Sequence, residues 1–395
     1  MKRNRNILIY MILFALFINF FGRDILYFIS SEVYGLSFQR LIPENSFYSA
    51  SITELIVVFF AIYILYLAIN TKYIEKKIYN DVVFNNKGKG KLLILGIISL
   101  FTLFYLYDLT HMVSSSERGV GQFNRSLLSS LMRVKIFIFP SVIFFLNMYE
   151  LKRSNWLFLA VISTIVILSS ILQGARRDAI MLILILLIYL MSYSKITYKK
   201  LLAGTSTMLT LVGVSMYFRM SDHYDINQLS FLIIFGILGG LGTNGILWQV
   251  KYYVSTTTGF LYGKTFFLYL VTLFVPSSFL YIFGDNEFIE RSSYLFNDLY
   301  NTNENMGYDF MMIADFYWNF GYFGYLLFIV MTVYIIFFIK KNIYAESVIK
   351  RSTVFIIMIY FISGLRSDFG FFIKNVFYAG MYIYLLRYLV RIKKA

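Results

Sequence analysis

Long runs of apolar residues alternate with short polar segments along most of this 395-residue chain. Several of these runs approach the roughly 20 residues that a helix needs to cross a bilayer. The clearest apolar runs cover approximately residues 7–21, 55–70, 92–107, 136–148, 156–172, 179–193, 201–218, 322–339, 353–365 and 371–389. The pattern therefore predicts an all-α polytopic membrane protein.

Two further apolar runs, about 231–248 and 265–283, are ambiguous because Gly239-Gly240 and Pro276 interrupt them. They are either two spanning helices or helices that lie in the outer membrane interface. The chain is therefore expected to have 10 to 12 transmembrane helices. Two crossings return the chain to the side from which it started, so the topology after this pair of runs is the same in both cases.

The composition agrees with this fold, because 59% of the residues are hydrophobic and only 14% are charged. The chain has no cysteine and only two histidines, so a thiolate or His-rich metal site is not expected. We predict one membrane-embedded domain over residues 1–395, with no cofactor, metal or nucleic-acid partner. A long external loop region, about 219–320, is expected before the last three helices, with the polar segment 284–307 as a candidate lid.

The distribution of basic residues predicts the orientation. If the N-terminus is cytoplasmic and the helices alternate, the inside segments hold 22 of the 36 Lys and Arg residues. Basic residues are enriched in the cytoplasmic loops of membrane proteins, which supports this orientation. An even number of helices places both termini in the cytoplasm.

The two sides also differ in the kind of basic residue they carry. The inside segments hold 16 Lys and 6 Arg, whereas the outside segments hold 2 Lys and 10 Arg. Arginine has a planar fork that binds phosphate oxygens two at a time. The outer face is therefore predicted to hold an anion; alternatively, its arginines pair with the many outside acids or with lipid headgroups. The arginines in question are Arg23, Arg118, Arg125, Arg176, Arg177, Arg219, Arg291 and Arg366.

Arg176 and Arg177 are the most conspicuous of these residues. They lie in the sequence Gln-Gly-Ala-Arg-Arg-Asp, residues 173–178, between the uncharged runs 156–172 and 179–193. The two runs are long enough to form a tight helical hairpin, and its mouth would hold both arginines at the outer membrane surface.

An anion at the outer leaflet suggests a sugar linked to a polyprenyl diphosphate. When the bond between the anomeric carbon and oxygen breaks, negative charge grows on the diphosphate, and nearby arginines stabilise that charge. Asp285-Asn286-Glu287 is a weak candidate for the paired acids of metal-dependent glycosyl transfer. The segment 222–225, with His223, is a candidate general base, and His111 is another. For all three, a solvated loop is the simpler interpretation.

Asp315 has a more informative context. From Asp315 to Gly324 the sequence matches the pattern acid-x-Tyr-x-Asn-Phe-Gly-x-x-Gly, which resembles the bacterial O-antigen and capsular repeat-unit polymerases of the Wzy type. Other places similar to the family are Gly263-Lys264-Thr265 followed by Pro276, the hairpin Gly174–Arg177, and the turn Arg366-x-Asp368. The acid is Asp315 here, where glutamate would be expected.

The resemblance implies a glycosyltransferase that polymerises undecaprenyl-diphosphate-linked oligosaccharide repeat units at the external face of the bacterial cytoplasmic (inner) membrane. The product would be O-antigen, as in lipopolysaccharide, or capsule. Membrane lipid, a chain-length regulator and the flippase of the same pathway are the expected partners. The expected catalytic residues are Arg176, Arg177, Arg366 and Asp315, with the arginines on diphosphate and Asp315 positioning the acceptor or removing its proton. The expected substrate-binding residues are Arg118, Arg125, Arg219, His223, Tyr317 and Asn319.

Three other functions are rivals. A flippase for the same lipid-linked unit needs charges along a central cavity, but the apolar runs here are nearly free of charge. An O-antigen ligase uses the same donor and would show the same arginine pattern. A membrane acyltransferase is disfavoured because no His-Asp pair lies deep in an apolar run. The pattern at residues 315–324 favours the polymerase.

Overall fold

The computed structural model describes residues 2–34, 46–72, 88–114, 133–149, 153–172, 176–193, 244–274, 291–300, 310–343, 345 and 347–392. Every regular element among these residues is a helix, which confirms the predicted fold class for this part of the chain. The N-terminal helices are α1 (Lys2–Tyr34), α2 (Ser46–Lys72), α3 (Gly88–Ser114), the 3-10 turn η1 (Arg133–Phe137), α5 (Ile138–Met148), α6 (Arg153–Leu172) and α7 (Arg176–Tyr193). The later helices are α10 (Asn244–Tyr253), the π-helical turn η4 (Val254–Thr258), α11 (Lys264–Phe274), α13 (Ser292–Tyr300), α14 (Met312–Phe320), α15 (Tyr322–Asn342), α16 (Val348–Gly364) and α17 (Phe369–Ile392).

Four helical stretches of the described chain are long and apolar enough to cross a membrane. They are Ala50–Ala68, Gly90–Tyr107, Tyr322–Asn342 and Phe369–Val390, and shorter apolar helices cover Leu8–Gly22, Lys135–Met148, Ser154–Ser170 and Lys264–Phe274. All of them coincide with apolar runs of the sequence. The predicted helix at 201–218 and most of the run 231–248 lie outside the described residues. The total of 10 or 12 helices and the cytoplasmic termini remain predictions.

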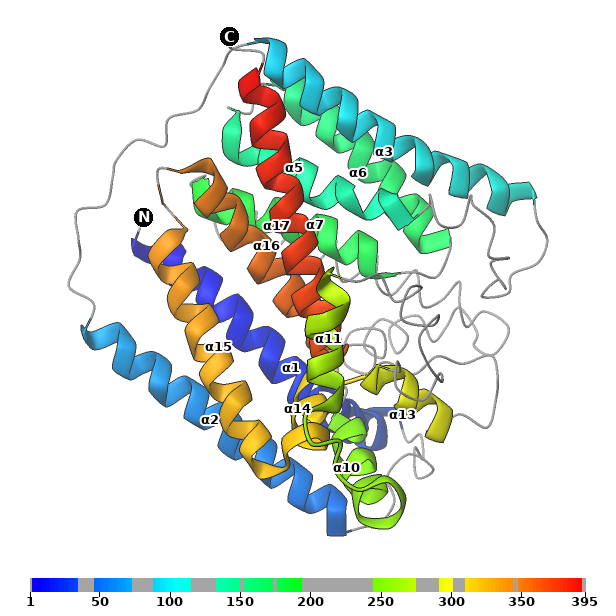
Figure 1. The fold of residues 1–395 in the computed structure, drawn as a ribbon, viewed down its shortest axis with the longest axis vertical. Helices are drawn as coiled ribbons and strands as arrows, with labels where there is room; N and C mark the ends of the chain where they lie inside the picture. Colours follow the sequence, from blue (N-terminus) through cyan, green and yellow to red (C-terminus); the bar gives the residue numbers. More distant parts are fainter. Residues whose placement is uncertain are drawn as a thin grey trace.

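The helices form a layered bundle. Figure 1 shows α2, α1 and α15 side by side at one edge, and α3 beside α6 at the opposite edge. Between these edges α16 packs against both α5 and α17, and α7 packs against α6 and α16. The bundle therefore brings the last two helices of the chain into contact with helices from its first half.

Helix α5 lies at the centre of this bundle. All of its residues from Ile138 to Asn147 are buried, as expected for a helix that is apolar on every side. Arg351 of α16 is also fully buried, and its guanidinium donates to the carbonyl oxygens of Asn147 at 2.7 Å and Ala345 at 2.8 Å. Arg351 thus satisfies a carbonyl in the last turn of α5 that has no partner within the helix.

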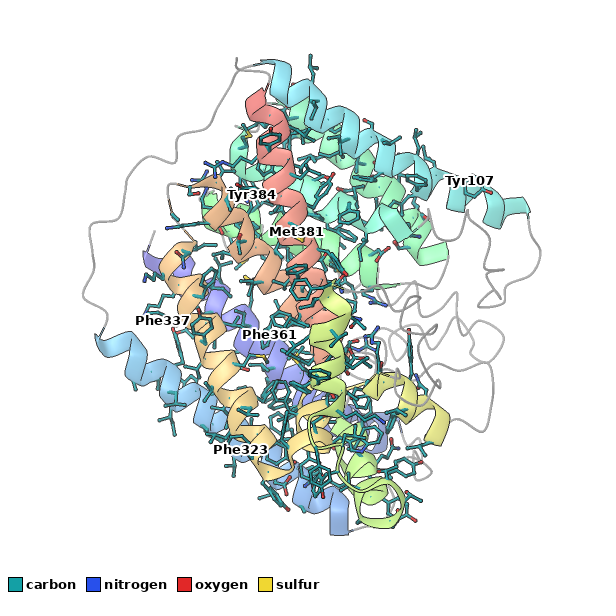
Figure 2. All side chains as sticks on the ribbon, viewed as in Figure 1. Tyr107, Phe323, Phe337, Phe361, Met381 and Tyr384 are labelled. Atoms are coloured by element: carbon teal, nitrogen blue, oxygen red, sulfur yellow. The ribbon has the colours of Figure 1, made fainter. Side chains whose placement is uncertain are left out.

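The outward faces of the edge helices are apolar. Phe60 of α2 and Tyr334 of α15 are among the large apolar and aromatic side chains exposed there. In Figure 2, Phe361 lies in the middle of the bundle, whereas Phe323 lies near the first turn of α15. An open groove of about 410 Å³ between α11, α14, α15 and α17 has only aromatic and aliphatic lining. Such surfaces suit a lipid environment and offer no polar chemistry.

The region expected as a long external loop, about 219–320, is largely helical where it is described. It contains α10, η4, α11, α13 and α14. The described part of the candidate lid is helix α13, and its preceding residue Arg291 forms an ion pair with Asp368 at 2.6 Å. Its polar residues therefore anchor a packed helix, and a lid role for the segment stays a prediction.

Candidate functional site

The segment that carried the family resemblance forms a tight corner between α14 and α15. Helix α14 ends at Gly321, whose φ of 59° lies in a region that favours glycine. At Gly324 an added Cβ would lie only 2.1 Å from the carbonyl oxygen of Phe316. The two glycines of the Gly-x-x-Gly pattern are therefore required by the backbone: one turns the chain, and the other lets α15 start against α14.

Asp315 lies inside this corner and is completely buried. One carboxylate oxygen, Oδ1, accepts hydrogen bonds from Ser292 Oγ at 2.5 Å and Asn319 Nδ2 at 2.9 Å. The other, Oδ2, accepts from the backbone N–H of Phe369 at 2.9 Å and from the Tyr269 hydroxyl at 3.3 Å. The carboxylate therefore ties α14 to the starts of α13 and α17 and to the middle of α11.

Burial and, as a smaller contribution, the nearby Asp368 carboxylate together raise the pKa of Asp315 to about 7. The hydrogen bonds from Ser292, Phe369 and Tyr269 act in the opposite direction, because they stabilise the ionised form. Asp315 thus has a pKa suited to proton transfer, but its oxygens face the protein interior.

Asp368 is the second buried carboxylate near the start of α17. Its Oδ1 accepts from the backbone N–H of Phe371 at 2.8 Å, so together with Asp315 it caps the first turn of the helix. Arg291 binds Asp368 with two parallel hydrogen bonds, from Nε at 2.9 Å and Nη2 at 2.6 Å. For Arg291 the structure therefore shows pairing with an acid, the alternative weighed from the sequence.

Arg177 lies over the start of the same helix. Its guanidinium carbon is 4.8 Å from the centre of the Phe371 ring, a cation–π contact between α7 and α17, and its side chain is exposed. The preceding turn, Leu365 to Asp368, contains Arg366. Arg177 and the Arg366-x-Asp368 turn therefore both lie near the start of α17, and their shared role stays a prediction.

Lys374 is a further cation at this helix start. It lies one turn after Phe371 and close enough to Arg291 and Asp368 to interact with both electrostatically. We call Arg177, Arg291, Arg366 and Lys374 the α17 cation cluster. Its members come from α7, the residue before α13, the α16–α17 turn and α17, so four separate parts of the chain place basic residues near the start of α17.

Tyr317 and Asn319 lie on opposite sides of α14 with different surroundings. Asn319 is buried and bonded to Asp315, and its Oδ1 accepts from Thr265 Oγ1 at 2.9 Å. The ring of Tyr317 stacks on Tyr325 with centres 5.5 Å apart, and the Lys251 ammonium lies 5.3 Å from its centre. Asn319 thus belongs to the Asp315 network, whereas Tyr317 belongs to an aromatic cluster.

The remaining predicted site residues are not placed. Arg118, Arg125, Arg219 and His223 lie outside the described residues, and Arg176 is described only as the first backbone position of α7. Within the described ranges, no three acidic or histidine side chains are grouped so that they could hold a metal ion.

Sequence reasoning missed several residues that the structure places near this site. Ser292 and Tyr269, the hydroxyl donors to Asp315, are 23 and 46 residues from it in the chain. Lys374 could have been noticed in the sequence, because it is one of only two lysines in the predicted outside segments. Lys251 was left unassigned; it forms an ion pair with Glu54 of α2, and Tyr325 donates to the same carboxylate.

Apolar helices of spanning length define a helical membrane protein, and basic side chains gather near the start of α17. Comparison with protein families identifies it further. The family model for the O-antigen polysaccharide polymerase Wzy matches residues 1–394, and the chain belongs to this family. This match confirms the resemblance read from residues 315–324. No curated protein and no solved structure matches the chain.

Proposed function

We propose that this protein joins undecaprenyl-diphosphate-linked oligosaccharide repeat units into O-antigen or capsular polysaccharide at the external face of the bacterial cytoplasmic membrane. The family match supports polymerase activity. The lipid-linked substrate, the external face and the cytoplasmic membrane are what we propose in addition. The observation that carries it is the α17 cation cluster, because a diphosphate leaving group needs positive charge held in place before the reaction.

In the proposed reaction, a hydroxyl oxygen of the acceptor unit attacks the anomeric carbon of the donor glycan. The bond from that carbon to the diphosphate oxygen breaks, the electron pair stays on the lipid diphosphate, and the acceptor hydroxyl loses its proton to a base. Arg177 is exposed, so we assign it and Arg366 to the diphosphate. Arg291 is already held by Asp368 and contributes mainly by fixing the start of α17.

We propose that Asp315 is a positioning residue. Its four hydrogen bonds use both oxygens, and none of its surface is exposed to a substrate. It holds the first turn of α17 in the register that places Phe371 under Arg177. The expected role in removing the acceptor proton is then left to a residue outside the described part of the chain, for which His223 is the candidate.

Variants of Arg177 test the proposal. Arg177→Lys keeps the charge but loses the planar fork, and Arg177→Gln loses both. Loss of charge-assisted hydrogen bonds worth about 1.5–3 kcal/mol corresponds to roughly a ten- to hundredfold lower polymerisation rate. The measurement is the chain-length distribution of the surface glycan in cells that express each variant at equal level.

Lys350→Gln is the matched control, because Lys350 is an exposed cation in the first turn of α16, at the end opposite the Arg366 turn. It should leave the chain lengths unchanged. If Arg177→Lys makes chains as long as the unsubstituted protein does, bidentate phosphate binding by Arg177 is wrong.

A further inference from the structure

An exposed tyrosine in an unfavourable backbone conformation lies between η4 and α11. Tyr262 has a φ of 49°, and no other non-glycine residue among those described has a positive φ. A side chain with a Cβ disfavours this conformation, yet 86% of the Tyr262 surface is exposed, so packing does not explain it. Such outliers often mark functional positions.

The turn that holds Tyr262 is built firmly. The backbone N–H of Leu261 donates to the carbonyl of Trp318 at 2.9 Å, and that of Lys264 donates to the carbonyl of Leu261 at 2.9 Å. Gly259 and Gly263 on either side also have positive φ values, 64° and 80°. The backbone therefore fixes Tyr262 in a position that points its ring outward.

Ring contacts connect Tyr262 to the α14–α15 corner. The rings of Phe260 and Tyr262 are 6.3 Å apart, those of Phe260 and Tyr317 5.8 Å, and those of Tyr317 and Tyr322 5.7 Å. Tyr322, at the far end of this row, is largely exposed. We call Phe260, Tyr262, Tyr317 and Tyr322 the aromatic platform.

An ion pair between Lys251 and Glu54 packs against two rings of the platform. The Lys251 ammonium lies 5.3 Å from the Tyr317 ring centre and 5.9 Å from the Tyr322 ring centre. Lys251 is only 4% exposed and is paired with Glu54, which also accepts from the Tyr325 hydroxyl at 2.5 Å. These contacts restrict the rings of Tyr317 and Tyr322, and restricted rings lower the entropy cost of binding a ligand on them.

Hydroxyl groups border the platform on the η4 side. This π-helical turn, a rare element that often occurs at functional sites, presents four exposed hydroxyl residues in succession: Ser255, Thr256, Thr257 and Thr258. Each hydroxyl donates to a nearby backbone carbonyl, which leaves its oxygen lone pairs available to accept from a ligand.

Aromatic faces beside hydroxyl acceptors match the chemistry of a sugar, whose ring has C–H faces and an edge of hydroxyl donors. We propose that the aromatic platform and the η4 hydroxyls bind the oligosaccharide part of the acceptor repeat unit. This inference rests on the proposed function, which identifies the saccharide as the acceptor repeat unit. The competing explanation is an aromatic belt at the membrane interface, which would need neither a strained backbone at Tyr262 nor an exposed row of hydroxyls.

Saccharide binding by the full-length protein in detergent tests the proposal. The probe is the single-repeat oligosaccharide released by mild acid from the lipid-linked unit of the same cells, and saturation-transfer NMR titration gives the affinity. Tyr262→Ala should weaken binding roughly three- to tenfold, and Tyr262→Trp should restore it, because the trend follows the loss and return of an aromatic face. Tyr322→Ala gives an independent variant outside the strained turn.

Tyr334→Ala is the matched control, since Tyr334 is similarly exposed but lies about three turns after Tyr322 in α15, beside the apolar groove. Unchanged affinity in both Tyr262→Ala and Tyr322→Ala would overturn the proposal, and so would equal weakening by Tyr334→Ala. Failure of the proposed function looks different: cells lacking the protein would keep their long glycan chains or would attach no repeat unit at all. If the long chains are lost, a single repeat unit stays attached and the two platform variants bind the probe normally, only the platform is wrong.

Discussion

Two buried carboxylates and one exposed arginine meet around the first turn of α17. Asp315 and Asp368 accept the backbone N–H groups of Phe369 and Phe371, while Arg177 lies over the Phe371 ring. Carboxylates at a helix N-terminus are stabilised by the free N–H groups and the helix dipole. The buried carboxylates of Asp315 and Asp368 thus fix the helix start on which the exposed Arg177 packs.

The importance of Asp315 was predictable from its sequence pattern, but its partners were not. The pattern at 315–324 marks Asp315 and Asn319 by their fixed spacing. By contrast, the backbone N–H of Phe369 is 54 residues away, and nothing in the local sequence indicates that α17 begins at that carboxylate. Four predicted residues, Arg118, Arg125, Arg219 and His223, are untested because they lie outside the described residues.

The raised pKa of Asp315 predicts a pH dependence of stability. The ordinary pKa of its carboxyl is 3.8, and in the fold it is about 7. Between these values the folded protein holds more protons than the unfolded chain, so the stability contributed at low pH is lost as the pH rises from about 4 to about 7. In Asp315→Asn, the unfolding temperature measured in detergent should depend less on pH within this range. Asp178→Asn should leave that pH dependence unchanged. An unaltered slope in Asp315→Asn would contradict the assignment.

At the scale of elements, the sequence predicted most described helices but did not mark the short helices α13 and α14 before α15 as separate elements. Apolar runs of spanning length are a strong signal, because bilayer thickness fixes their length. Helices α10, α13 and α14 are short and contain many polar residues, and they are stabilised by contacts with distant parts of the chain, such as Arg291 with Asp368. Short segments of this kind have no periodicity long enough to be recognised.

The corner between α14 and α15 gives a sharp prediction at this scale. Gly324→Ala would place a methyl group 2.1 Å from backbone that cannot move independently, so it should destabilise the fold by about 3 kcal/mol or more. Gly380→Ala in α17 meets no atom within 4 Å and should stabilise slightly, by about 0.5–1 kcal/mol. Thermal unfolding of both variants, with folded yield in detergent, measures the difference. Equal stability of the two variants would show that the corner is built differently.

At the scale of the whole molecule, Tyr322 of the aromatic platform is the first residue of α15, and Lys340 and Lys341 lie in its last turn. The positive-inside rule predicts that the start of α15 is external. Because the chain has no cysteine, single-cysteine variants give an unambiguous test. A membrane-impermeant thiol reagent should label Tyr262→Cys in intact cells, and Lys350→Cys only after lysis. The reverse labelling would invert the topology.

The surface glycan profile of cells that lack this protein tests the central claim most directly. A polymerase is needed only to extend the glycan, whereas transport and attachment of single units continue without it. We predict that the ladder of long chains disappears, that a single repeat unit remains attached, and that expression of the protein restores the ladder. If no repeat unit is attached at all, the protein acts as a flippase or a ligase, and the polymerase account is contradicted.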